Sequence, residues 1–401
     1  MILAGAWLGY RAWPAIHGGS IERFLEKHWM RPLAAQGEPP AGFSPLEASL
    51  APESCASCHP GQYRDWRGSL HARAIGPGLL WQLGLFSPQE ANRCLDCHAP
   101  LAEQKALFAI ERGWPDAPKV APPSYVGAEL HRQGLVCSAC HVRRHLRFGP
   151  APKTAAQAGD TPHGGFSVQA AFGDSRFCSV CHQFAPEGRS LAGKLLENTY
   201  EEWRTSRAAR EGVACQGCHM PDRRHLWRGI HDREMVSDGV KSELAATRLP
   251  GGRLAIQARL INAGAGHYFP TYVVPKVTMS VILGQGAAAR EVARQVIGRT
   301  VNVDMDQEIS DTRIPPGGES LLTTEVAAPP GEQPLILRVD VAPAEHYERM
   351  FQSMLQRKLD TAARTLLEEA LQNASAARYR LDDLELMAPA SAGESRRAVA
   401  N

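Results

Sequence analysis

Five copies of one short pattern constrain this chain more than any other feature. Each copy reads Cys-x-x-Cys-His, and the copies occupy residues 55–59, 94–98, 137–141, 178–182 and 215–219. This is the attachment sequence of c-type haem, in which both thiols bond to the porphyrin and the adjacent histidine ligates the iron. The sequence therefore predicts five covalently bound haems.

The five copies use all ten cysteines of the chain. The predicted attachment residues are Cys55, Cys58, Cys94, Cys97, Cys137, Cys140, Cys178, Cys181, Cys215 and Cys218. The predicted proximal ligands of the irons are His59, His98, His141, His182 and His219.

Two other uses of paired cysteines fit this pattern less well. Structural zinc takes two such pairs per ion, so five pairs would leave one pair without a partner. One pair alone is compatible with a redox disulfide, but five pairs that are each followed by histidine are not typical of disulfides. A disulfide scaffold is typical of short secreted chains, whereas this chain has 401 residues.

The composition predicts a loop-rich chain with little side-chain material for a core. Aromatic residues make up 7%, and the chain has 36 glycines and 29 prolines. Over residues 50–235 the haems must therefore supply much of the apolar interior, and we expect no fold there without them. The formal net charge of +2 does not indicate a nucleic-acid partner, because each haem adds two propionates.

The N-terminal region, residues 1–50, predicts an export or anchoring segment followed by a linker. Residues 2–9 are apolar, but the run is too short for a membrane span and lacks the basic start of a full signal peptide. We interpret residues 1–16 as the remnant of a signal or anchor; the alternative is a short amphipathic helix. A helix is expected at about residues 20–30, with His17 and His28 at the surface. Since haem c is attached outside the cytoplasm, the predicted location is the periplasm, the periplasmic side of the membrane, or the cell surface.

The rest of the chain predicts an α+β protein. Residues 51–245 are expected to form a mainly helical, loop-rich pentahaem domain. Over residues 246–343 apolar residues alternate, as in Leu254, Ile256, Ala258 and Leu260, which predicts an antiparallel β-sandwich. Residues 344–387 predict one long amphipathic helix, because apolar residues recur every four positions. Residues 388–401 are expected to be disordered.

A weak internal repeat indicates where the second iron ligands come from. Tyr63-x-x-Trp66-Arg67-x-Ser69 matches Tyr200-x-x-Trp203-Arg204-x-Ser206, and His71 follows the first copy where the second has Ala208. Tyrosine and tryptophan three residues apart share one helix face, which suits packing against a porphyrin. We therefore expect His71 to be a distal ligand. His267 is a second candidate, because Gly264 and Gly266 permit unusual φ angles and close backbone approach beside it.

Several of these motifs together resemble a known family. The pattern Cys-x-x-Cys-His, then Tyr-x-x-Trp-x-x-Ser-x-His, then Gly-Val-Ala before Cys215 and Met-Pro after His219, then Gly-His267-x-x-Pro-Thr, resembles multihaem c-type cytochromes of the periplasm. These are the cytochrome c-554-like proteins, related in haem packing to the tetrahaem partners of hydroxylamine oxidoreductase. The resemblance covers residues 50–345. It implies mostly bis-histidine haems in stacked and T-shaped pairs, electron transfer, and a C-terminal β-domain. The chain has no Cys-x-x-Cys-Lys motif, which weakens a nitrite-reductase interpretation.

The number of histidines is sufficient for five irons with two histidines each. Of 15 histidines, five are in the motifs and the others can supply distal ligands. The best candidates are His71, His131, His163, His231 and His267, with His225 and His145 in reserve.

An iron with two histidines has no open position and can only pass electrons. The sequence therefore favours an electron relay between redox partner proteins over an enzyme, with no catalytic residue assigned. The alternative is an oxidoreductase of nitrogen or sulfur compounds in which one iron keeps an open site. Membrane anchoring through the N-terminus, and a homo-oligomer or filament, are compatible with the relay.

Overall fold

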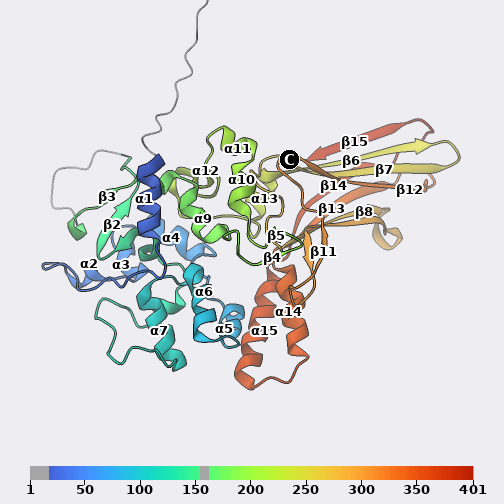
Figure 1. The fold of residues 1–401 in the computed structure, drawn as a ribbon. Helices are drawn as coiled ribbons and strands as arrows, with labels where there is room; N and C mark the ends of the chain where they lie inside the picture. The colour runs from blue at the N-terminus through green and yellow to red at the C-terminus, as the bar shows by residue number, and fades with distance from the viewer. Residues whose placement is uncertain (1–17, 154–161, 401) are drawn as a thin grey trace, which may run out of the picture.

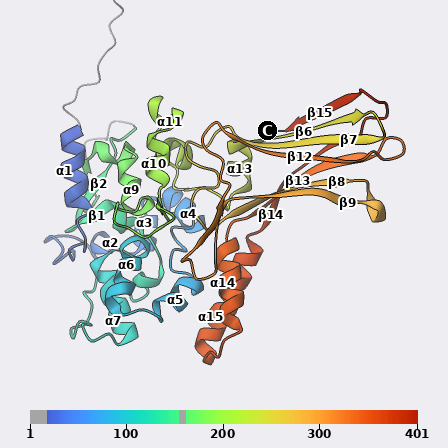
Figure 2. The ribbon, with the colours of Figure 1, turned by 45° about the vertical axis from the view of Figure 1, so that its right-hand side comes forward.

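The computed structural model describes residues 18–153 and 162–400, so the predicted signal remnant and His17 lie outside the described residues. The described residues form a helical part and a part made of long antiparallel strands, which lie side by side (Figures 1 and 2). The predicted α+β class is confirmed. Among the described residues no helix is both long and apolar enough to cross a membrane.

The helical part consists of short helices joined by loops. In chain order these are α1 (Gly18–His28), α2 (Pro45–Ala48), α3 (Pro52–Ala56), α4 (Pro60–Gly68), α5 (Pro77–Leu83), α6 (Pro88–His98), α7 (Ala102–Arg112), α8 (Cys137–His141), α9 (Arg176–His182), α10 (Thr199–Arg204), α11 (Arg207–Arg210), α12 (Cys215–His219) and α13 (Arg233–Gly239). Each helix from α2 to α6 begins with proline, which suits a first turn because an N–H there would have no partner within the helix.

Short turns and strands connect these helices. They are the 3-10 turns η1 (Leu130–Arg132), η2 (Pro162–Gly164), η3 (Ala170–Gly173) and η4 (Pro221–Arg223), and the strands β1 (Val142–Arg143), β2 (Leu146–Gly149), β3 (Ser167–Val168), β4 (Ser190–Leu191) and β5 (Lys194–Leu195).

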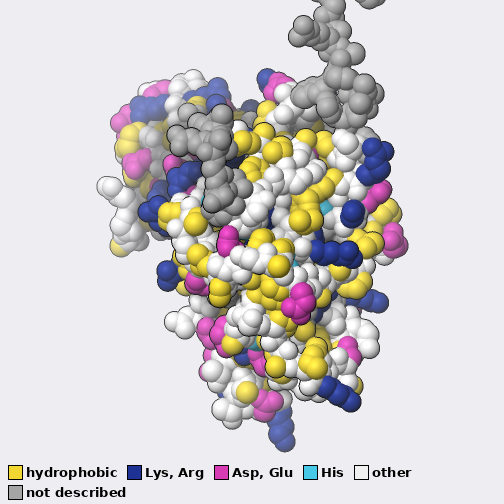
Figure 3. Space-filling model, turned by 90° about the vertical axis from the view of Figure 1, so that its left-hand side faces the viewer, with side chains coloured by type: hydrophobic (Ala, Val, Ile, Leu, Met, Phe, Trp, Pro, Cys, Tyr) yellow, Lys and Arg dark blue, Asp and Glu magenta, His cyan; other side chains and the backbone are white. Residues whose placement is uncertain are grey.

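The helical part has two separate apolar cores. The first includes Leu50, Trp66 and Leu130, and the second includes Leu95 and Phe108. Hydrophobic side chains also reach the surface in patches over this part of the molecule (Figure 3).

The strands of the β part form two four-stranded antiparallel sheets, in the orders β12-β7-β6-β15 and β14-β13-β8-β9. Their bounds are β6 (Val240–Leu249), β7 (Arg253–Asn262), β8 (Lys276–Leu283), β9 (Arg290–Ile297), β12 (Glu319–Ala327), β13 (Pro334–Ala342), β14 (Tyr379–Met387) and β15 (Ser395–Ala400). A separate pair is formed by β10 (Arg299–Val301) and β11 (Glu308–Asp311), and η5 (Gly286–Ala288) precedes β9.

One core lies between the two sheets. Leu254, Ile256, Ala258 and Leu260 of β7 are buried there, as the alternation predicts, and so are Leu335 and Leu337 of β13. Because successive side chains of a strand point to opposite faces, the intervening residues are more exposed.

The predicted single long helix over residues 344–387 is wrong. The structure has two helices, α14 (Glu345–Leu355) and α15 (Thr361–Ala376), followed by β14. Asp360 starts the second helix, since its side chain accepts a hydrogen bond from the backbone N–H of Ala363 at 2.8 Å. The two helices pack against each other and against Trp81 of α5, so the apolar stripe serves a helical hairpin.

The predicted disordered tail over residues 388–401 is also wrong for its described residues. Residues 395–400 form β15, which pairs with β6 from Ser395–Thr247 to Ala400–Ser242. Side chains add to this pairing, since Arg397 forms an ion pair with Glu243 at 2.7 Å. The β part therefore begins at Val240 and uses strands on both sides of the helical hairpin, beyond the predicted limits of 246 and 343.

Candidate haem-iron sites

Each of the five motifs lies at or beside the end of a short helix. The second motif ends α6, where Ser87 and Glu90 form a capping box with Pro88 at the first helical position. The third and fifth motifs are themselves one-turn helices, and the fourth motif ends α9. A helical turn places the first and fourth residues of a motif on one face, as two bonds to one porphyrin require.

The cysteines of different motifs lie close together in pairs. Contact with Cys55 and burial raise the pKa of Cys137, while the same contact lowers the pKa of Cys55. The same relation holds between Cys97 and Cys181, and between Cys178 and Cys215. The first motif is thus next to the third, and the fourth is next to both the second and the fifth.

Three motif histidines face a second histidine across a gap. The ring centres are 6.3 Å apart for His182 and His71, 6.1 Å for His141 and His225, and 6.3 Å for His219 and His267. Metal–imidazole bonds are about 2 Å long, so two imidazoles on opposite sides of one iron have ring centres roughly 6 Å apart. The spacing of all three pairs therefore fits one iron between the rings.

The hydrogen bonds of the histidines show which ring nitrogen is engaged. Nδ1 is hydrogen-bonded to a backbone carbonyl in six of them: His98 (Ala74, 2.8 Å), His141 (Phe148, 2.8 Å), His163 (Gly165, 3.0 Å), His219 (Arg228, 2.5 Å), His225 (Arg223, 3.1 Å) and His267 (Tyr268, 2.9 Å). A metal-bound histidine usually donates its other N–H in this way, which fixes the ring orientation. Nε2 of these six is therefore available for an iron.

Burial keeps two of the facing rings, those of His71 and His141, in the form that binds metal. Burial lowers the pKa of His71 to about 3 and that of His141 to about 4, so both are neutral at physiological pH. Neutral imidazole is the metal-binding form.

For His59 of the first motif, a second histidine is indicated by electrostatics and not by a ring contact. The pKa of His59 is lowered by burial and then by the charge of His163, which places His163 nearby. His163 lies in η2, and its backbone N–H donates to Glu47 at 2.8 Å. We therefore treat these two histidines as a fourth candidate pair.

The other distal candidates are placed elsewhere. His131 uses Nε2 for Glu111, at 2.6 Å, and the reserve candidate His145 uses Nε2 for the carbonyl of Gly37, at 3.0 Å. His231 is exposed, and no motif histidine faces its ring within the described chain. His225, held in reserve from sequence, takes the place facing His141. For His98 no second histidine ring is found opposite within residues 18–153 and 162–400.

The expectation that His28 lies at the surface is wrong. His28 is buried, stacks on Phe24 with ring centres 4.7 Å apart, and uses Nε2 for the carbonyl of Cys140 at 2.8 Å. A signal was present in the sequence, because Ile21, Phe24 and Leu25 put His28 on the apolar face of α1.

The internal repeat is also a structural repeat. Trp66 donates its indole N–H to the carbonyl of Leu135 at 2.8 Å, and Trp203 donates to Val213 at 3.0 Å. Each acceptor lies two residues before a motif. The backbone N–H of Leu135 in turn donates to His71, as that of Val213 donates to Ala208. Each tryptophan thus fixes the approach of the chain to a motif.

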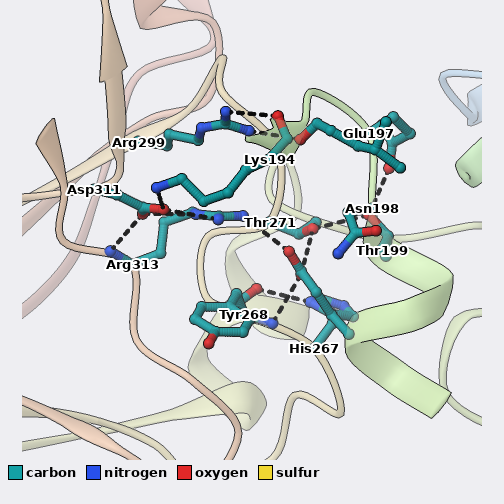
Figure 4. A network of polar contacts seen from close by, with 12 residues as sticks. Lys194, Glu197, Asn198, Thr199, His267, Tyr268, Thr271, Arg299, Asp311 and Arg313 are labelled. Carbon is teal, nitrogen blue, oxygen red and sulfur yellow. Dashed lines mark hydrogen bonds and ion pairs between the residues drawn. The ribbon is translucent and has the colours of Figure 1, made fainter. Parts of the chain in front are cut away.

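A buried polar network holds the loop of His267 (Figure 4). Glu202 accepts hydrogen bonds from the backbone N–H of Tyr268 at 3.1 Å and from the hydroxyl of Thr271 at 3.0 Å, and it pairs with Arg313 at 2.9 Å. The Arg313 guanidinium also lies over the Tyr268 ring at 5.0 Å. The network connects α10 to the β part.

The glycines of this loop allow close approach and do not adopt positive φ angles. A Cβ at Gly266 would lie 3.0 Å from the side chain of Ala208 and 3.1 Å from Trp203. The loop therefore packs on the second copy of the repeat, at the position where the first copy has His71.

The donor set fits haem c better than zinc. Within the described residues, which include all ten cysteines, no cluster of three or more His, Cys, Asp or Glu is suited to a metal ion. Paired cysteines with an adjacent histidine, opposite a second histidine with free Nε2, are instead what a covalently attached haem needs.

Two comparisons with known proteins found similarities. The family described as cytochrome c554 and c-prime matches residues 54–121, which contain the first two motifs. The crystal structure of a penta-heme cytochrome c552 from Thermochromatium tepidum is similar, with a TM-score of 0.57 and 18% sequence identity, over 86% of this chain and 100% of that chain. At this identity the likeness concerns the fold. No curated protein matches this chain.

Proposed function

We propose that this multihaem c-type cytochrome relays electrons through five covalently bound haems in the periplasm or at the cell surface. The observation that carries the proposal is the spacing of the three facing histidine pairs, between 6.1 and 6.3 Å. When bound, haem supplies one-electron redox chemistry, and an iron with two histidines offers substrate no open position. The chain's own residues hold, orient and bury the sites.

The contacts between motifs support a branched path. The first site is next to the third through Cys55 and Cys137. The fourth site is next to the second through Cys97 and Cys181, and next to the fifth through Cys178 and Cys215. His71 also lies close to His225. The pKa of His71 is lowered mainly by burial, then by the charges of His182 and His98, and last by the charge of His225. In the proposed order the first site connects through the third to the fourth, where the path branches to the second and the fifth. The first, second and fifth sites are therefore its three ends.

The relay needs a donor and an acceptor, which we propose to be redox proteins. The second motif packs with α5, which contacts the helical hairpin, whereas the fifth site includes His267 from a loop of the β part. Anchoring through the N-terminal segment, and self-association through the β part, remain part of this proposal.

The alternative function, an oxidoreductase with one open iron, would be centred on the second motif. The observation that favours this position is that His98 has its Nδ1 engaged by Ala74, while no described histidine ring faces it. Carbon monoxide separates the two functions, because it binds a reduced iron that has an open position. Binding at one iron of five would support the alternative, and no binding would support a pure relay.

The mass and the paramagnetic resonance spectrum of the purified protein test the relay. We expect the mass to exceed that of the polypeptide by five haems, and the spectrum to contain low-spin signals typical of bis-histidine iron. A polypeptide without covalent haem, or with zinc at the cysteines, would contradict the proposal.

A further inference from the structure

The segment that follows the fifth motif reaches three of the candidate sites. Residues 220–232, here called the strap, begin directly after His219. The carbonyl of Arg228 accepts the Nδ1–H of His219 at 2.5 Å, and His225 faces His141. One short stretch of chain therefore touches the fifth and the third sites, and Trp227 extends it to the fourth.

Trp227 contacts the second histidines of two different pairs. Its ring centre lies 4.6 Å from that of His71 and 5.1 Å from that of His225. His71 faces His182, and His225 faces His141. Within the described residues no other aromatic ring touches the second histidine of more than one pair.

The position of Trp227 is fixed from both sides. Its φ angle is 42°, which is a strained value for a bulky residue and persists only where the surroundings impose it. Asp65 of α4 holds the strap, since it accepts the backbone N–H of His225 at 3.1 Å and the guanidinium of Arg224 at 2.7 Å. The indole also packs against the first apolar core of the helical part.

The angles between facing rings differ according to this contact. The angle between the two ring planes is 38° and 35° in the pairs that contact Trp227. It is only 12° between His219 and His267. A side chain packed on a ligand fixes the orientation of that ligand. The larger angle between the ring planes and the contact with Trp227 thus occur together, at the third and fourth sites.

We propose that Trp227 is a positioning residue that sets the angle between the imidazole planes at the third and fourth sites together. The inference rests on the proposed function, because it requires irons between these rings. Because one side chain contacts both sites, a substitution of Trp227 should change the ligand geometry at the third and fourth irons together. The fifth site should be unchanged.

The test compares Trp227→Phe and Trp227→Ala with the wild-type holoprotein. Electron paramagnetic resonance of the oxidised protein reports the angle between the two imidazole planes, and a redox titration reports each potential. In the alanine variant we expect two low-spin signals to move together, with a shift of the two corresponding potentials. A smaller shift is expected in the phenylalanine variant, which keeps an aromatic ring at the position.

Trp81→Phe is the matched control. Trp81 is buried like a core residue, and its ring contact is with Phe351 and not with a histidine. Its spectrum should equal that of the wild type. If the alanine variant loses haem, the phenylalanine variant with a full haem count decides the question.

Two outcomes would overturn the inference about Trp227. One is an unchanged spectrum in both variants, and the other is an equal shift of all signals, which would indicate a general loosening of the fold. A wild-type protein without bis-histidine signals would instead overturn the proposed function. The two failures are therefore distinguishable.

Discussion

At the scale of single residues, the ring nitrogen that a histidine uses for a hydrogen bond separates two ligand candidates from three structural histidines. His71 is not sorted in this way, because its buried Nδ1 has no hydrogen-bond partner. His28, His131 and His145 engage Nε2, whereas His225 and His267 engage Nδ1 and keep Nε2 for an iron. Sequence spacing cannot reveal this difference, because it depends on which carbonyl or carboxylate the fold brings to the ring.

His267→Ala should remove one bis-histidine site. His267 is the described histidine that faces His219, so one low-spin signal should be lost and one potential should shift. Visible and paramagnetic resonance spectra of the holoprotein check this. His231→Ala, at an exposed position, is the control and should leave the spectra unchanged. Identical spectra for His267→Ala and the wild type would show that another residue ligates the fifth iron.

The buried Lys276 should make the free energy of unfolding depend on pH. It is buried where β8 meets α14, and burial lowers its pKa to about 8 from an ordinary value of 10.5. Between these two values the unfolded chain binds more protons than the folded one, so the free energy of unfolding rises with pH. The rise is at most about 3 kcal/mol for a shift of this size.

Lys276→Met removes the titrating group and keeps a similar shape. Denaturation at pH 8 and pH 10.5 should therefore show the wild type gaining stability relative to the variant as the pH rises. Parallel pH profiles for the two proteins would mean that Lys276 titrates normally in the folded state.

At the scale of elements, the two copies of the repeat offer a matched pair of glycines. Gly134 and Gly212 both have positive φ, at 69° and 74°. A Cβ at Gly134 would lie 2.3 Å from the carbonyl oxygen of His71, whereas one at Gly212 would meet nothing within 4 Å. Only the first position thus combines a strained conformation with a steric clash.

We expect Gly212→Ala to destabilise the protein by about 1–2 kcal/mol, the cost of the left-handed conformation. Gly134→Ala should cost more and should also change the signal of the fourth site, because the clash moves His71. Thermal unfolding and paramagnetic resonance measure the two effects. Equal effects of the two substitutions would exclude the role of Gly134 in placing His71.

The elements also show how far sequence reasoning reaches. Alternation predicts the buried face of β7, because period two is visible within a single strand. The four-residue period from Tyr347 to Leu371 could not reveal the turn between α14 and α15, since it continues on both sides of Asp360. The strands β14 and β15 were missed because partners distant in sequence, β13 and β6, stabilise them.

The sequence also predicts only part of the arrangement of the candidate sites. The motifs predict where haem is attached, and the repeat predicts His71 as a distal ligand. The choice among His131, His163, His225 and His231 depends on which loops cross opposite a motif, and that is set by tertiary contacts such as those of Asp65 and Glu47 with the loops.

At the scale of the whole molecule, the last strand completes the β part. Deleting residues 395–401 would remove the partner of β6 and expose the edge of that sheet. We expect a lower unfolding temperature and aggregation, measured by thermal scanning and light scattering. Arg397→Ala is the control, because it keeps the backbone pairing and removes one surface ion pair, which contributes about 0–1 kcal/mol. A truncated protein as stable as the wild type would mean that β15 is dispensable.

The pairing of β15 with β6 also sets an order of biogenesis. The sheet that contains β6 and β7 gains its edge strand β15 from residues 395–400, so it closes only after this segment has paired with β6. The loop that carries His267 follows β7 directly. All five attachment motifs precede β6, and a maturation enzyme can therefore reach every one of them while the β part is still open. We therefore expect haem attachment at the five motifs to precede closure of this sheet.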